Sequence, residues 1–174
     1  MTPEKITWED LEDGKKLEAA VAVFNLDRTK ENLFTVLQIL RDSYVWVPCT
    51  AVFSDADKER LNKIAENLVN NPDADPTELI GKTFTSEGVT RLVPDILKNG
   101  EKYFFPIFST VEAMGEYGND FSKVQKHMLE VIMLARNNEK DLSGIVLNAF
   151  SDPFILSREL WDYVEKMNSR ISEE

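Results

Sequence analysis

The sequence contains very few of the residues that build metal, redox or disulfide sites. It has one cysteine, Cys49, and one histidine, His127, among 174 residues. A lone cysteine cannot form a disulfide within the chain, and one Cys with one His cannot supply the four ligands of a structural zinc ion. We therefore expect no metal, no cofactor and no internal disulfide, a pattern that suits a reducing cytoplasm.

Glycine-rich motifs and long hydrophobic runs are also missing. The 7 glycines are scattered, and Pro76 stands where a phosphate-binding loop ending in Gly81-Lys82-Thr83 would need glycine. No G-x-S-x-G nucleophile elbow is present. The longest early apolar run, residues 19–24, is far shorter than a membrane span. We expect no signal peptide, no membrane span and a cytoplasmic protein.

Basic residues are few relative to acidic ones. The 20 Lys and Arg are outnumbered by 31 Asp and Glu, which gives a net charge of −11. This charge repels nucleic-acid phosphates and anionic lipid, so we expect neither nucleic acid nor a membrane as a partner. It would speed association with a basic protein.

The remaining composition is that of a folded protein. Hydrophobic residues make up 43% of the chain and charged residues 29%, which is enough for a packed core. At the usual domain size, the length predicts one domain over residues 1–174.

Helical periodicity is strongest near the N-terminus. Apolar residues at i, i+3, i+4 and i+7 predict helices over residues 17–24 and 32–42, the second with Thr29 as its N-cap. The β-branched and aromatic residues 44–53 predict a strand, with Pro48 at an edge or a bulge. Helical spacing returns at Leu61, Ile64, Ala65 and Leu68, in a helix capped by Ser54 or Asp55. A polar loop is expected over residues 70–83, as a candidate for disorder or a partner contact.

The second half predicts a hairpin and further helices. Asn99-Gly100 favours a type I′ turn, and the strand after it ends at Ser109-Thr110-Val111-Glu112, a capping-box spacing. An apolar stripe predicts one amphipathic helix over residues 121–136. Strands at 144–148 and 154–156 precede a last helix that begins at N-cap Ser157 and carries Ile171. The order predicts an α+β fold with a mixed sheet of about five strands, flanked by helices, and an N-terminal helical hairpin.

Two pairs of residues are candidates for chemistry. Cys49 and His127 could form a nucleophile and its base, although Cys49 in a strand and His127 at the edge of a helix stripe also suit structural roles. Asp95 and Glu112 could act as paired carboxylates, although Glu112 also suits a helix N-terminus and Asp95 a turn. We expect no catalytic site, and an enzyme of unrecognised type that uses these residues is the alternative.

Aromatic residues cluster after the hairpin turn. Phe104 and Phe105 point to opposite faces of their strand, so both are covered only if the sheet is sandwiched. The other interpretation is an exposed aromatic patch, which would serve as a protein-binding surface or a homodimer interface.

Four passages resemble the SseB N-terminal domain family, named after the enhanced serine sensitivity protein. They span most of residues 17–165, with Ala149 where the family usually has proline. The passages are Leu-Glu-Ala-Ala at 17–20, Leu-Arg-Asp-Ser-Tyr-Val-Trp-Val-Pro at 40–48, Phe-Pro-Ile-Phe-Ser-Thr-Val-Glu at 105–112 and Gly-Ile-Val-Leu-Asn-Ala-Phe at 144–150.

The resemblance implies a single α+β domain, with its core at about 14–172, without an established catalytic activity. Together with the missing cofactor motifs, it predicts a cytoplasmic protein-interaction or regulatory module with an unidentified protein partner. The expected contact points lie where a strand meets a helix and in a second loop. They are Pro106, Phe108, Ser109, Glu112 and Asn148.

Overall fold

The computed structural model describes residues 6–52, 55–70 and 91–171. The chain has two compact units. The first comprises Met1–Cys49 and Pro94–Glu174, and the second comprises Thr50–Val93. Helices and strands are mixed along the chain, so the predicted α+β class is confirmed.

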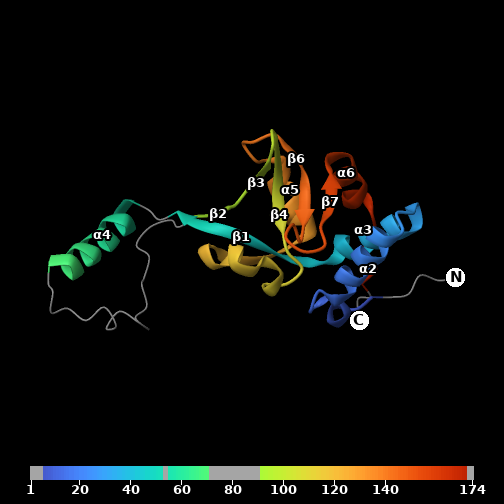
Figure 1. The fold of residues 1–174 in the computed structure, drawn as a ribbon, viewed down its shortest axis with the longest axis horizontal. Coiled ribbons are helices and arrows are strands. Elements are labelled where there is room, and N and C mark those ends of the chain that lie inside the picture. Colours follow the sequence, from blue (N-terminus) through green and yellow to red (C-terminus); the bar gives the residue numbers. More distant parts are fainter. Residues whose placement is uncertain (1–5, 53–54, 71–90, 172–174) are drawn as a thin grey trace. The chain divides into compact units, whose positions relative to one another are not determined.

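An N-terminal helical hairpin opens the first unit, as predicted. It follows the short helix α1 (Trp8–Leu11) and consists of α2 (Lys15–Leu26) and α3 (Lys30–Asp42), which pack together (Figure 1). Thr29 caps α3, because its Oγ1 accepts a hydrogen bond from the Asn32 amide at 3.2 Å. The predicted N-cap is therefore confirmed.

A four-stranded sheet forms the centre of the first unit. Its strand order is β3-β4-β6-β7, in which β4 and β6 run parallel and the outer pairs are antiparallel. The strands are β3 (Leu97–Asn99), β4 (Lys102–Ile107), β6 (Leu142–Leu147) and β7 (Phe154–Ser157).

The predicted hairpin joins β3 to β4, but its turn lies one residue later than expected. Asn99 pairs with Lys102, so the two loop residues are Gly100 and Glu101. Gly100 has φ 62°, whereas Asn99 has no positive φ. Positive φ at the first loop position alone is the type II′ pattern, in which glycine occupies that position.

A second sheet has three strands in the order β2-β1-β5. The structure thus has seven strands in two sheets within the described residues, rather than about five in one. Phe108, just after β4, exchanges two backbone hydrogen bonds with Trp46 of β1, at 2.8 and 2.9 Å. The strands are β1 (Tyr44–Val52), β2 (Arg91–Pro94) and β5 (Ser122–His127).

The single helix predicted over residues 121–136 is wrong. Its first half is strand β5, which pairs antiparallel with β1, and only its second half is helix α5 (Met128–Arg136). Only Phe121 and Val124 are apolar in the first half, so the stripe there was too sparse to oppose pairing with β1. Tertiary hydrogen bonding overrides weak periodicity of this kind.

The predicted capping box at residues 109–112 is also wrong. The 3-10 helix η2 (Glu112–Asp120), which is interrupted by a kink at Gly115, begins at the last of these residues, and the Ala113 amide donates to Thr110 Oγ1 at 3.1 Å. Thr110 is therefore the residue that caps this turn. Ser109 instead lies in a buried polar network.

The C-terminal helix begins where predicted but ends earlier. Ser157 is the N-cap of α6 (Arg158–Lys166). Ile171 lies beyond the helix and forms an isolated parallel bridge with Ile6. The bridge brings the two ends of the described chain together.

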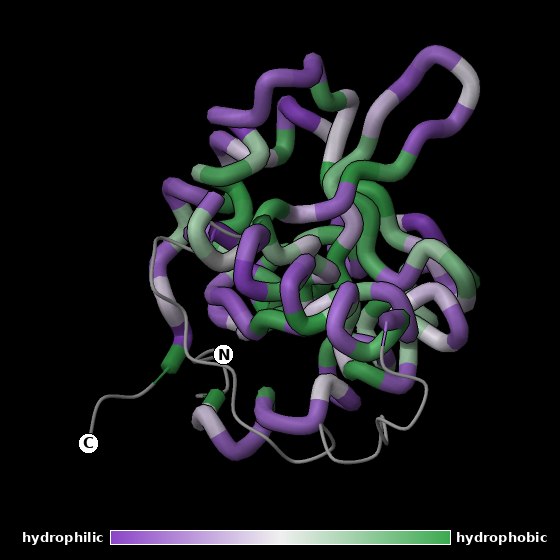
Figure 2. The backbone as a smooth tube through the Cα atoms, turned by 90° about the vertical axis from the view of Figure 1, so that its left-hand side faces the viewer, coloured by the Kyte–Doolittle hydropathy of each residue, from purple (hydrophilic) through white to green (hydrophobic). Residues whose placement is uncertain are grey.

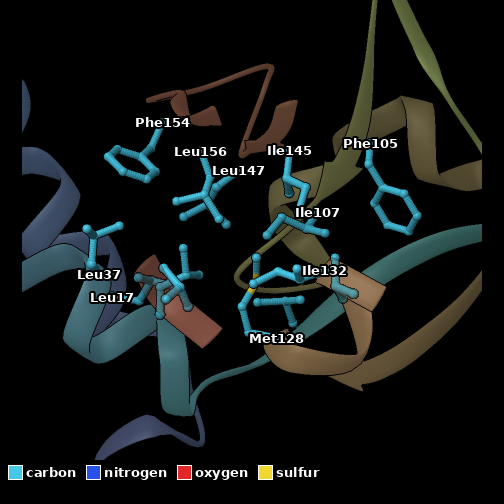
Figure 3. Packing of buried hydrophobic residues seen from close by; sticks show 14 of the residues in the cluster. Leu17, Leu37, Phe105, Ile107, Met128, Ile132, Ile145, Leu147, Phe154 and Leu156 are labelled. Atoms are coloured by element: carbon cyan, nitrogen blue, oxygen red, sulfur yellow. The ribbon is translucent and has the colours of Figure 1, made fainter. Parts of the chain in front are cut away.

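The core lies between the four-stranded sheet and the surrounding helices. Figure 3 shows sheet residues such as Phe105, Ile145 and Leu156 facing Leu37 of α3 and Ile132 of α5. Figure 2 shows hydrophobic stretches gathered in the middle of this unit and hydrophilic ones toward its periphery. Cys49 is 1% exposed and belongs to the core, which confirms its structural interpretation.

The second unit contains the end of β1, helix α4 and most of β2. Helix α4 (Asp55–Asn70) contains the predicted helical positions 61–68 and begins at Asp55, one of the two residues predicted as its N-cap. Ser54 and the predicted loop beyond Asn70 lie outside the described residues. Along the described ranges, no helix combines the length and apolar character needed to cross a membrane.

Candidate functional site

Two polar residues meet where the parallel strands β4 and β6 end. Ile107 pairs with Leu147 at this end. Asn148 directly follows Leu147, and Ser109 lies two residues after Ile107. The Asn148 amide donates to the Ile107 carbonyl at 2.9 Å, which extends the pairing beyond β6. The carboxyl ends of neighbouring parallel strands are a common place for ligand binding.

Asn148 and Ser109 form a buried hydrogen-bond network. The Ser109 amide donates to Asn148 Oδ1 at 3.0 Å, and Asn148 Nδ2 donates to Ser109 Oγ at 2.9 Å. Each residue is only 5% exposed. Asn148 has φ 51°, a left-handed conformation that asparagine tolerates better than most residues. The network therefore fixes the segment after β4 to the segment after β6.

The same network reaches helix α2. Ser109 Oγ donates its proton to Glu18 Oε1 at 2.5 Å. Helix α2 begins after Gly14, whose φ is 72° and where an added Cβ would lie 2.7 Å from the Ser109 carbonyl oxygen. This close approach requires glycine and places the first turn of α2 against the strand ends.

A cavity of about 490 Å³ opens beside this network, and we call it the polar cleft. Three of its lining residues carry carboxylates: Glu18, Glu112 and Asp152. Asp152 Oδ1 accepts a hydrogen bond from Asn25 Nδ2 at 2.6 Å, which holds that carboxylate in place. Among the described residues that line the cleft, none is Lys or Arg. The cleft is therefore a preformed anionic surface.

The five residues predicted as contact points occupy different environments. Glu112 is exposed and lines the polar cleft, and Asn148 also lines it while bonded to Ser109. Pro106 is buried within β4 and pairs with Val146 of β6. Phe108 is fully buried, so it supports the neighbouring surface from beneath. The structure thus brings three of the five together at one place.

Sequence reasoning missed Glu18 and Asp152 as parts of the cleft. Glu18 lies in the first turn of α2, and Asp152 lies in the turn before β7, more than a hundred residues later. No spacing rule connects these two residues, because only the fold brings them together.

Phe108 belongs to an aromatic cluster next to the cleft. Its ring is stacked on Phe150 with centroids 6.1 Å apart, and the Tyr117 ring lies 5.0 Å from Phe150 and 4.8 Å from Phe121. Phe150 is 56% exposed. The cluster thus presents one aromatic ring to solvent. Of the strand aromatics considered for a homodimer interface, Phe105 is fully buried and Phe104 is half-buried.

The residues considered for catalysis do not form one group. Cys49 lies opposite Ser122, and His127 lies opposite Tyr44. They are five positions apart along the ladder, which corresponds to about 17 Å. Burial raises the pKa of the Cys49 thiol, which keeps it protonated near neutral pH and therefore weakly nucleophilic.

The two carboxylates of the other candidate pair have different partners. Asp95 accepts a hydrogen bond from the Tyr117 hydroxyl, and its amide donates to the Pro48 carbonyl at 2.9 Å. Burial, together with the Asp95 carboxylate, raises the pKa of Tyr117. Glu112 lines the polar cleft instead. Within the described parts of the chain, no three His, Cys, Asp or Glu residues are grouped so that they could hold a metal ion.

Comparisons of the chain with protein families, with curated proteins and with solved structures find no match.

Proposed function

We propose that this protein is a cytoplasmic, SseB-like interaction module that binds a basic segment of another protein in the polar cleft. The observation that carries the proposal is the anionic cleft at the ends of β4 and β6, which is lined by Glu18, Glu112 and Asp152. A Lys or Arg side chain is the complement of such a surface, because its donors can pair with several carboxylates at once.

The charge of the whole chain supports the same class of partner. A net charge of −11 attracts a basic surface over about a Debye length, so encounter would be fast at low ionic strength. The Asn148 and Ser109 network supports the proposal differently. Because it is buried and fixed before binding, little conformational entropy is lost when a partner binds there.

The test is affinity capture from a cytosolic extract of the host with three forms of the tagged protein. These are the wild type, Glu112→Lys and Glu116→Lys. Both residues are exposed on η2, but only Glu112 lines the cleft. The two variants make the same charge change four residues apart in the η2 segment, on either side of the kink at Gly115, so they differ mainly in location. We expect one protein to be retained by the wild type and by Glu116→Lys, and lost by Glu112→Lys.

Two further features of the captured protein would be checked. Its retention should weaken as salt is raised from 0.05 to 0.3 M, because exposed ion pairs are screened. Its contact segment, mapped by cross-linking, should contain Lys or Arg. Equal retention by both variants would place the contact elsewhere and would reject the polar cleft as the binding surface.

A further inference from the structure

A second cavity, of about 410 Å³, lies between α1 and the outer face of β1 and β5. Its walls include the aromatic rings of Trp8 and Tyr44, whose centroids are 5.5 Å apart at an interplanar angle of 52°. Trp8 is 50% exposed and Tyr44 is 47% exposed. Two large aromatic rings thus remain half open to solvent around one cavity, which we call the aromatic pocket.

Carboxylates stand beside these rings. Glu9 and Glu12 line the same pocket, together with Gln125 and the buried side chain of Leu11. Aromatic faces carry negative charge density, and they attract cations whose hydration shell is weak. A pocket that combines such faces with carboxylates matches an organic cation better than it matches an anion or a neutral apolar group.

The histidine next to the pocket carries no positive charge that would repel a cation. His127 packs edge-on against Tyr44, with ring centroids 5.1 Å apart. Its Nδ1 accepts a hydrogen bond from the Leu129 amide at 3.2 Å, so that nitrogen carries no proton. The imidazole is therefore neutral in this arrangement, and Tyr44 remains 47% exposed beside it.

The backbone around the pocket is fixed. Thr7 caps α1, with the Asp10 carboxylate accepting from the Thr7 amide at 2.9 Å. Ile6 precedes it and is 1% exposed, and its amide donates to the Arg170 carbonyl at 3.3 Å. Trp8 is thus held in place by its neighbours, and binding need not order it.

Elsewhere in the first unit, Lys and Arg side chains of the chain itself form cation–π contacts with aromatic rings. Arg136 and Arg158 lie over the Trp161 ring at 5.6 and 5.4 Å, and Lys140 lies over the Tyr103 ring at 4.5 Å. The rings of Trp8 and Tyr44 instead line an open pocket.

We propose that the aromatic pocket binds an organic cation of the methylated ammonium type, held against the Trp8 and Tyr44 rings and neutralised by Glu9 and Glu12. The group could belong to a methylated lysine side chain or to a free quaternary ammonium compound. The proposal is independent of the polar cleft, since the two cavities share no lining residue.

The test compares choline with 3,3-dimethyl-1-butanol, a probe in which a neutral tert-butyl group replaces the trimethylammonium group. Binding is followed by NMR at the indole N–H signals of the three tryptophans. We expect choline to shift the Trp8 signal in a saturable way and to bind about 5- to 30-fold more tightly than the neutral probe. Equal shifts with both probes, or none with choline, would overturn the proposal.

Variants separate the aromatic and the carboxylate contributions. We expect Trp8→Ala to abolish choline binding and Trp8→Phe to weaken it, because phenylalanine is a poorer cation acceptor than tryptophan. In Phe and Ala variants, binding is followed by calorimetry. Glu12→Gln should weaken binding several-fold at low salt, whereas Glu101→Gln, an equal charge change in the β3–β4 turn, should not. If Glu12→Gln and Glu101→Gln behave alike, the carboxylate contribution is refuted.

A final arm identifies the source of the cation. A neutral peptide that carries one trimethyl-lysine is compared with choline and with the same peptide carrying unmodified lysine. Tighter binding of the methylated peptide than of choline assigns the pocket to a modified protein. Tighter binding of choline assigns it to a small molecule, and a preference for unmodified lysine over both contradicts the methylated class.

Discussion

The side chain and the backbone of Asn148 both contribute to the structure of the polar cleft. It occupies the left-handed region at φ 51°, satisfies the buried Ser109 amide and donates to the Ser109 hydroxyl, which in turn bonds to Glu18. Two separate costs therefore attach to its replacement. One is backbone strain, and the other is a buried polar group left without a partner.

Replacement of Asn148 should separate these costs. We expect Asn148→Ala to lower the free energy of unfolding by about 2–4 kcal/mol, from the unpaired Ser109 amide and from left-handed strain. Asn148→Gly should lower it by about 1 kcal/mol less than alanine does, because glycine removes only the strain. Urea unfolding followed by tryptophan fluorescence measures both. If alanine and glycine were equally destabilising, strain at this position would be negligible.

At the scale of elements, periodicity predicted helices wherever the apolar stripe was dense. The two helices of the N-terminal hairpin and the start of α6 at Ser157 agree with the structure. The prediction failed at β5, where a stretch of mostly polar residues pairs with β1. Strand pairing depends on a partner about 75 residues away in sequence, and the local pattern carries no information about that partner.

The junction of β5 and α5 should make stability depend on pH. His127 is the N-cap of α5, and burial, together with the charge of Arg41, lowers its pKa below the ordinary value of 6.5. The unfolded chain therefore binds a proton at a higher pH than the folded chain. We expect the contribution of His127 to stability to be complete above about pH 6.5 and to fall as the pH drops toward the lowered pKa.

Because His127 is the only histidine, one variant isolates this effect. His127→Asn keeps a favourable N-cap residue but cannot titrate in this range. We expect the urea midpoint of the wild type to fall relative to that of His127→Asn between pH 7.5 and 5.5. Parallel profiles for the two proteins would show that the histidine cap does not titrate differently in the folded and unfolded chains.

For the whole molecule, part of the candidate site followed from local sequence and part did not. Ser109, Glu112 and Asn148 could be proposed because they follow strands that the sequence indicates. Glu18 and Asp152 could not, since they come from opposite ends of the first unit and meet only after the sheet and α2 pack. The aromatic pocket is similar, because Trp8 and Tyr44 belong to separate elements.

The division into two units leads to a prediction about the whole chain. Every member of the core cluster found among the described residues lies in Met1–Cys49 or Pro94–Glu174. We therefore expect a variant in which residues 53–90 are replaced by a linker of about six Gly and Ser residues to unfold cooperatively. Shortening this connection should itself add about 1–2 kcal/mol to stability through the lower entropy of closure. Urea unfolding measures this, and circular dichroism should show the loss of α4.

The same variant also tests where function resides, because the polar cleft and the aromatic pocket both lie in the first unit. It should keep the capture that depends on Glu112 and the choline shift at Trp8. A shortened chain that folds cooperatively but captures no partner would assign partner binding to residues 53–90 and would contradict the polar cleft as a sufficient surface. A chain that loses cooperative unfolding would show that the first unit depends on the second for its stability.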